Sequence, residues 1–183
     1  MIDEKRDRNS KDSIHSSLRE SIIEHLFIGE ILKKLWLEER FQVEVLKPQV
    51  DNAGYDLAIN CNSNPDLNHS SILYIQLKSS RSDAKTARVN VSRKLIKKPK
   101  WCVIWIIFEQ KEKTFDLKKY RIFPKLESSP PDTENFKIAK NTRGDKAERP
   151  GHRVVPVGKF GPLISIDEVI NQLFAKIPNK ETS

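Results

Sequence analysis

The segment Ser-Ile-Leu-Tyr-Ile-Gln-Leu-Lys-Ser-Ser, residues 71–80, decides how this chain is expected to fold. Its apolar residues alternate with Gln76 and Lys78, and this period of two is typical of a half-buried β-strand. A shorter alternating segment begins upstream at Asp56, and the polar connection between the two suits a pair of antiparallel strands. We therefore expect Asp56, Gln76 and Lys78 to share one face of a sheet, which brings together a carboxylate, an amide oxygen and an ammonium group.

The length and the ends of the chain predict a single folded domain. With 183 residues the chain can bury one hydrophobic core without disulfides or metals to stabilise it. Most of residues 1–14 are charged or polar, and Asn179–Ser183 offer nothing apolar that could dock onto a core. We expect both ends to be disordered tails and residues 15–177 to form the domain.

The apolar runs, the cysteines and the amino terminus indicate where in the cell the protein is expected. The longest apolar run, Trp101–Phe108, is far shorter than the roughly 20 residues of a membrane-spanning helix. Cys61 and Cys102 are too few for a metal cluster, and the charged amino terminus lacks the apolar core of a secretion signal. We therefore expect a cytoplasmic protein that makes no contact with a membrane.

The strongest local signal is a helix over about residues 17–38. Ser17-Leu18-Arg19-Glu20 has the Ser-x-x-Glu form of a capping box, and the apolar residues that follow recur with helical spacing. On a helical wheel Glu30 lies close to Ile23 and Leu26, so it points where an apolar side chain is expected. A buried carboxylate is costly unless it is paired, protonated or bound to a metal ion, so we expect a compensating group opposite Glu30.

The remaining pattern predicts several strands and two short helices. The expected elements are strands at 41–46, from about 55, and at 101–108, 115–123 and 153–157, helices at 92–98 and 165–174, a basic loop at 81–86 and a long loop at 127–149. The run at 101–108 is apolar throughout, as in the central strand of a sheet, and 115–123 suits an edge strand. Ser165-Ile166-Asp167-Glu168 forms a second capping box. The fold class is therefore α/β, with a central mixed β-sheet flanked by helices.

Positive charge is concentrated in one part of the chain. The formal net charge is +8, and nine basic residues against one acidic residue lie between Lys78 and Lys100. Such a run suits contacts with the phosphates of a nucleic acid, although the solvated face of a helix explains similar runs. The candidate phosphate-binding residues are Arg81, Lys85, Arg88, Arg93 and Lys94.

The order of these elements resembles that of the PD-(D/E)XK nuclease superfamily, which has a restriction-endonuclease-like fold. That superfamily carries a Glu on the first core helix, an Asp at the start of the second core strand, and Glu-x-Lys or Gln-x-Lys on the third. The matching residues here are Glu30, Asp56 and Gln76-Leu77-Lys78. The resemblance covers about residues 17–108. Gly54-Tyr55-Asp56 stands where the family has Pro-Asp, and Gln76 stands where Glu is commoner, which removes one negative charge.

The resemblance implies a Mg²⁺- or Mn²⁺-dependent endonuclease that hydrolyses phosphodiester bonds of nucleic acid, with DNA favoured over RNA. Asp56 would be the central metal ligand, joined by the amide oxygen of Gln76, the carbonyl of Leu77, and Glu30 directly or through water. Lys78 would orient or deprotonate the attacking water. A homodimer is a further expectation from the family.

Two other classes of function fit the same residues. The first is a non-catalytic nucleic-acid-binding module that keeps the fold and the basic surface. The second is a protein-interaction subunit in which Glu30 and Lys78 form only a buried ion pair. Binding of a divalent metal separates the nuclease from both alternatives, and salt-dependent binding of nucleic acid separates the first alternative from the second.

Overall fold

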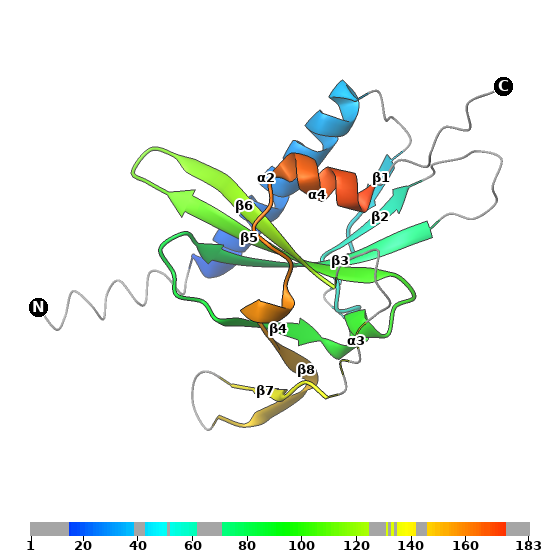
Figure 1. Ribbon diagram of the computed structural model, residues 1–183, viewed down its shortest axis with the longest axis vertical. Coiled ribbons are helices and arrows are strands. Elements are labelled where there is room, and N and C mark those ends of the chain that lie inside the picture. The colour runs from blue at the N-terminus through cyan, green and yellow to red at the C-terminus, as the bar shows by residue number, and fades with distance from the viewer. Residues whose placement is uncertain are drawn as a thin grey trace, which may run out of the picture.

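The computed structural model describes residues 15–38, 43–50, 52–61, 71–124, 131, 133, 135–141 and 146–174. The tails predicted at 1–14 and 178–183 lie outside these ranges. The helices are α2 (Ser16–Leu37), α3 (Arg93–Ile96), α4 (Ile166–Leu173) and the short 3-10 helix η1 (Val157–Lys159) (Figure 1). The strands are β1 (Val43–Leu46), β2 (Leu57–Cys61), β3 (Ser71–Arg81), β4 (Arg88–Ser92), β5 (Trp101–Gln110), β6 (Phe115–Phe123), β7 (Ile138–Lys140) and β8 (Glu148–Pro156).

Five strands form a mixed sheet in the order β1-β2-β3-β5-β6. Neighbouring strands run antiparallel except β3 and β5, which are parallel and are connected through β4 and α3. β5 is buried along most of its length, as expected for an apolar strand covered on both faces of the sheet. The predicted α/β class with a central mixed sheet is therefore confirmed, and so are the internal strand at 101–108 and the edge strand at 115–123.

A second sheet of three strands, in the order β4-β8-β7, is not predicted by the sequence patterns. β4 follows the predicted basic loop, and β7 and the first two residues of β8 lie in the predicted loop at 127–149, so that loop prediction is partly wrong. β4 alternates, with Val89 and Val91 buried, but its pairing depends on the distant β8, where Val155 lies opposite Val89. Strands this short form only where such a partner exists.

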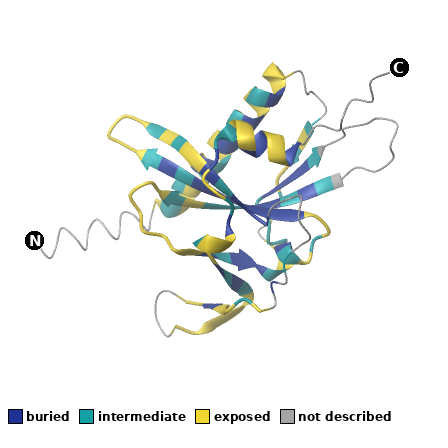
Figure 2. Cartoon of the chain, viewed as in Figure 1, coloured by how far each residue is buried: buried dark blue, intermediate teal, exposed yellow. Residues whose placement is uncertain are grey.

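The molecule has three layers, with the five-stranded sheet in the middle (Figure 1). α2 and α4 cover one face and bury Phe27 and Ile170 against it. The second sheet and α3 cover the other face and enclose Trp105 and Leu95. Figure 2 shows the central strands buried between these two covering layers. Fully burying a large apolar side chain stabilises a fold by about 1.5–3 kcal/mol, so these cores hold the surrounding polar groups in fixed positions.

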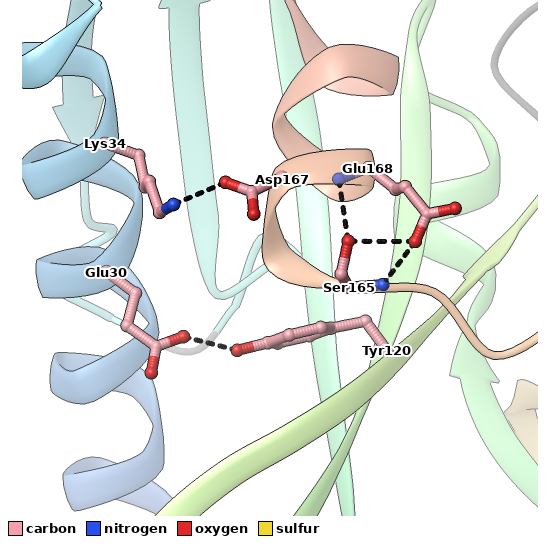
Figure 3. A network of polar contacts seen from close by, with 6 residues as sticks. All are labelled: Glu30, Lys34, Tyr120, Ser165, Asp167 and Glu168. Carbon is pink, nitrogen blue, oxygen red and sulfur yellow. Dashed lines mark hydrogen bonds and ion pairs between the residues drawn. The ribbon is translucent and has the colours of Figure 1, made fainter.

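The two predicted capping boxes have different outcomes. The N-cap of α2 is His15, which makes no capping hydrogen bond with its side chain, so Ser17 lies inside the helix and the first prediction is wrong. At α4 the prediction is confirmed, because Ser165 Oγ accepts a hydrogen bond from the Glu168 N–H at 3.3 Å and Glu168 Oε2 accepts one from the Ser165 N–H at 2.7 Å (Figure 3). Asp167 in the same turn pairs with Lys34 of α2 at 2.6 Å.

Candidate functional site

The register of β2 and β3 brings Asp56 to the middle of the Gln-x-Lys segment. Leu57 lies opposite Ile75, and the Asp56 N–H donates to the Ile75 carbonyl at 2.8 Å. The Asp56 carboxylate then accepts a hydrogen bond from the Leu77 N–H at 2.6 Å. The predicted antiparallel pairing is therefore confirmed, and its connection at 62–70 lies outside the described residues.

Gly54 allows the turn before Asp56 to reach the start of α3. Its φ of 77° lies in the left-handed region, and a Cβ at this position would lie 2.4 Å from Ser92 Oγ. Only glycine takes such a conformation and such an approach without strain. Ser92 is also the N-cap of α3, where its Oγ accepts a hydrogen bond from the Lys94 N–H at 3.2 Å, as predicted.

A cavity of about 710 Å³ opens beside this turn. Its walls come from the first half of α2, the turn before β2, the middle of β3, the start of α3 and the strand β8. Asp56, Gln76, Leu77 and Lys78 all line it. Four of the five predicted site residues thus lie together, with charges of both signs facing one hollow.

Glu30 does not line this cavity. Its Oε2 accepts a hydrogen bond from the Tyr120 hydroxyl at 2.5 Å, between α2 and strand β6 (Figure 3). Burial, and then the bond to Glu30, raise the pKa of Tyr120 above its ordinary value. The expected compensating group is therefore Tyr120, and the structure does not bring Glu30 to Asp56 as a ligand or to Lys78 as an ion-pair partner.

The carboxylates that α2 presents to the cavity are Glu20 and Glu24. Glu24 precedes Glu30 by six residues, which places the two about 9 Å apart along the helix axis and about 120° apart around it. Glu24 is half-buried and also contacts the ammonium of Lys47. The sequence signal that could have found this pair is the spacing of four residues between Glu20 and Glu24, which puts both on one helical face.

Gln76 carries an oxygen atom that could bind a metal ion, but it also forms a hydrogen bond that joins two elements of the fold. Its side chain is buried, and Oε1 accepts a hydrogen bond from the Ser92 N–H at 3.1 Å. An amide oxygen has two acceptor positions, and this bond occupies one of them. Gln76 therefore links β3 to the N-cap residue of α3, which limits its expected role as a metal ligand.

The groups around Asp56 fit a divalent ion that keeps much of its water. Among the described residues, no group of three or more His, Cys, Asp or Glu side chains lies close enough together to hold a metal ion. The N–H and C=O of one strand residue point to the same side, so the Leu77 carbonyl, like its N–H, faces the Asp56 side of β3. Mg²⁺ is commonly bound through one or two carboxylates and several waters, and the oxygen donors of Asp56 and Leu77 suit it.

The predicted phosphate-binding residues are spread over a wider area than the cavity. Of the five, Lys94 alone lines it, and its Nζ donates to the Asn52 carbonyl at 2.8 Å. Arg81 does not line the cavity, and its Nε forms an ion pair with Asp83 Oδ1 at 3.2 Å.

The other three lie farther along the same segment. Lys85 and Arg88 are exposed in the loop before β4 and at its first residue, and Arg93 is half-buried in α3. The basic residues that sequence reasoning missed are Arg149 and His152, which β8 brings to the cavity.

Comparisons with known proteins do not assign the chain to a family. The sequence matches no family model, and a search among curated proteins finds no match. Within the described part of the chain, no helix has both the length and the apolar character needed to cross a membrane.

Proposed function

We propose that this protein is a metal-dependent nuclease that hydrolyses phosphodiester bonds, with DNA as its favoured substrate. The observation that carries the proposal is the position of Asp56, whose carboxylate is held by the Leu77 N–H beside Lys78 in a cavity that also receives Glu24. A carboxylate and a backbone carbonyl can hold a divalent ion, and an ammonium group beside them can stabilise the charge that develops on a phosphate during hydrolysis.

The order and direction of the elements support the proposal. α2 is followed by three antiparallel strands, then by a crossover containing α3, and then by β5 parallel to β3. The resemblance implies a restriction-endonuclease-like core with this order of elements, so the order supports the proposal. Asp56 stands just before the second strand and Gln76-Leu77-Lys78 in the third, at the positions expected for that core.

Asp56 and the Leu77 carbonyl would hold the divalent ion, with Glu24 opposite them on α2. When bound, the ion supplies positive charge for a phosphate oxygen and lowers the pKa of a coordinated water. Asp56 is kept in place by the bond from Leu77, and Glu24 by Lys47. The resemblance assigns the helix carboxylate to Glu30, and the geometry favours Glu24 for that role.

Lys78 is the cation best placed for chemistry. It is half-buried and faces the cavity one residue beyond Leu77. An ammonium group there can orient the attacking water and stabilise charge that develops on the phosphate. The bond from Gln76 to Ser92 fixes the start of α3 and so presents Lys94 at the rim, where it can contact a neighbouring phosphate.

A plasmid-cleavage assay in Mg²⁺, Mn²⁺ or excess chelator tests the proposal. Wild type should cut in the presence of metal, and Asp56→Asn, which keeps the shape of the side chain but removes its charge, should lose at least about a hundredfold in rate. Asp83→Asn is the matched control, because Asp83 is an exposed carboxylate that pairs with Arg81 outside the cavity. Equal rates for Asp56→Asn and Asp83→Asn would refute the proposal.

The second candidate is a module of the same fold that binds nucleic acid without cutting it. The observation that favours it is the hydrogen bond that Gln76 Oε1 accepts from the Ser92 N–H, because this bond occupies an oxygen atom that a metal ion would need as a ligand. In that case metal would not bind at Asp56, while nucleic acid would still bind with a strong dependence on salt. Calorimetric titration with Mg²⁺ and a binding titration in chelator separate the two candidates.

A further inference from the structure

α2 carries a second apolar row on the face directed away from the core. The row runs through Leu18, Ile22, His25, Gly29, Leu32 and Trp36. Its four large apolar side chains are exposed by 60% at Leu18, 41% at Ile22, 44% at Leu32 and 70% at Trp36. The buried face of the same helix is formed by Ile23, Phe27, Ile31 and Leu35. The helix is thus apolar on two opposite faces, and the core uses only one of them.

The spacing of the exposed row is that of a helix-pairing seam. Its members follow one another at intervals of four, three, four, three and four residues. These intervals average 3.6 residues, which is one turn of an α-helix, so the row forms one line of side chains that can face a second helix over several turns. Single apolar residues on a surface are ordinary, whereas four large exposed apolar side chains on one line, two toward each end of a row about five turns long, mark an interaction surface.

The row is also symmetric about its centre at Phe27. Leu18 and Trp36 lie at equal distances from this centre along the sequence, and so do Ile22 and Leu32, and His25 and Gly29. In a two-fold interface, residue i of one copy meets residue j of the other, and j meets i. Two antiparallel copies of this row would therefore place Trp36 on Leu18, and His25 on Gly29.

We infer that α2 pairs with α2 of a second copy of this chain in an antiparallel, two-fold symmetric arrangement. Antiparallel packing sets a large side chain against a small one, whereas parallel packing would set Trp36 on Trp36 and leave a gap between two copies of Gly29. Antiparallel helices also oppose their dipoles favourably. The inference stands apart from the proposed nuclease activity, because α2 presents Glu24 to the cavity from a different face.

The segments on either side of the described residues hold few apolar side chains that could cover this row. Residues 3–13, which precede α2, contain no apolar side chain, and residues 175–183 add Ala175, Ile177 and Pro178. The helix has 22 residues and is about 33 Å long. A single helix pair of this length lies at the small end of specific interfaces, so we expect a dimer with a dissociation constant in the micromolar range.

Gly29 provides a clean test, because the isolated chain has room for a side chain there. A Cβ added at Gly29 meets nothing within 4 Å, and the same holds at the exposed Gly158 in η1. Gly29→Glu therefore leaves the fold of one copy intact and places a charge at the centre of the seam. Gly158→Glu adds the same charge outside it and serves as the matched control.

Sedimentation velocity over a wide range of protein concentration measures the association. We expect wild type and Gly158→Glu to dimerise alike, and Gly29→Glu to bind its own copy at least about tenfold more weakly, because the charge would be buried at the interface. A monomeric wild type, or equal association of Gly29→Glu, would overturn the inference. In that case the row would serve another protein or an anionic lipid surface, and binding of wild type to phosphatidylserine vesicles distinguishes these.

Cysteine cross-linking tests the direction of pairing. Ile22→Cys and Leu32→Cys are made separately in a Cys61→Ser background, since Cys102 is buried. An oxidised mixture should form a disulfide between the two variants, while each variant alone should form little. Efficient cross-linking of either variant with itself would show parallel pairing and refute the arrangement.

Discussion

Tyr120→Phe isolates one hydrogen bond between the sheet and α2. The Tyr120 hydroxyl donates to Glu30 at 2.5 Å, while its ring packs on Phe27 with centroids 5.8 Å apart and its backbone pairs with Ile164. Phenylalanine keeps the ring and backbone contacts. The substitution therefore removes the hydroxyl alone and leaves the Glu30 carboxylate without this donor.

The expected loss of stability follows from the charge on Glu30. A hydrogen bond to a charged group contributes about 1.5–3 kcal/mol. Glu30 is half-buried, so water replaces part of the lost bond, and we expect a decrease near the lower end of that range. For a chain of this size, each kcal/mol lowers Tm by about 2–4 °C. Urea unfolding at pH 7, followed by the fluorescence of the buried Trp101 and Trp105, measures the free energy of unfolding.

The pH dependence gives an independent readout. The pKa of Tyr120 is raised above its ordinary value of 10.0, first by burial and then by Glu30. Because the folded-state pKa is the higher one, this stabilisation is complete below about pH 10 and is lost as the pH rises through the folded pKa. The free energy of unfolding should therefore fall more steeply above pH 10 for wild type than for Tyr120→Phe.

A double-mutant cycle with Glu30→Gln measures the coupling between the two side chains. Tyr55→Phe is the matched control, since Tyr55 is half-buried and contacts Tyr74 and Lys98 through its ring. Equal unfolding free energies for wild type and Tyr120→Phe, or zero coupling in the cycle, would refute the structural role that we assign to Glu30.

Three other predictions concern the site. Glu24→Gln should lower the rate of plasmid cleavage at least about tenfold while Glu30→Gln keeps it, because Glu24 lines the cavity and Glu30 does not; the reverse order would restore Glu30 to the site. Lys94→Ala and Arg149→Ala should each lower the slope of log affinity for nucleic acid against log salt concentration by about one. The slope of a Lys85→Ala/Arg88→Ala variant shows whether the contact extends to the loop before β4. Gly54→Ala should lower the unfolding free energy by more than about 1 kcal/mol, since its φ is positive and Ser92 blocks a Cβ; a melting curve like that of wild type would contradict this.

The pairing of β2 with β3 is determined by the sequence alone. In each of these strands, the alternation of apolar and polar residues around Asp56 and Gln76 determines which side chains share a face of the sheet. A shift of the pairing by one residue would turn every side chain of a strand to the other face. The apolar run of β5 and the capping box at Ser165 are equally local signals, and the structure confirms both. Local signals of this kind predict the folded structure because the residues that form the pattern also stabilise the element, through burial of the strand or capping of the helix.

The choice between Glu24 and Glu30 was made by the tertiary structure. α2 has two apolar faces, and a helical wheel cannot tell which of them packs against the sheet. A buried face centred on Ile23 and Leu26 predicts that Glu30 points toward the site. Packing against the sheet buries Phe27 instead, and this rotation brings Glu24 to the cavity. The second sheet, which brings Arg149 to the site, likewise depends on pairing between segments far apart in the chain, and no local pattern encodes such pairing.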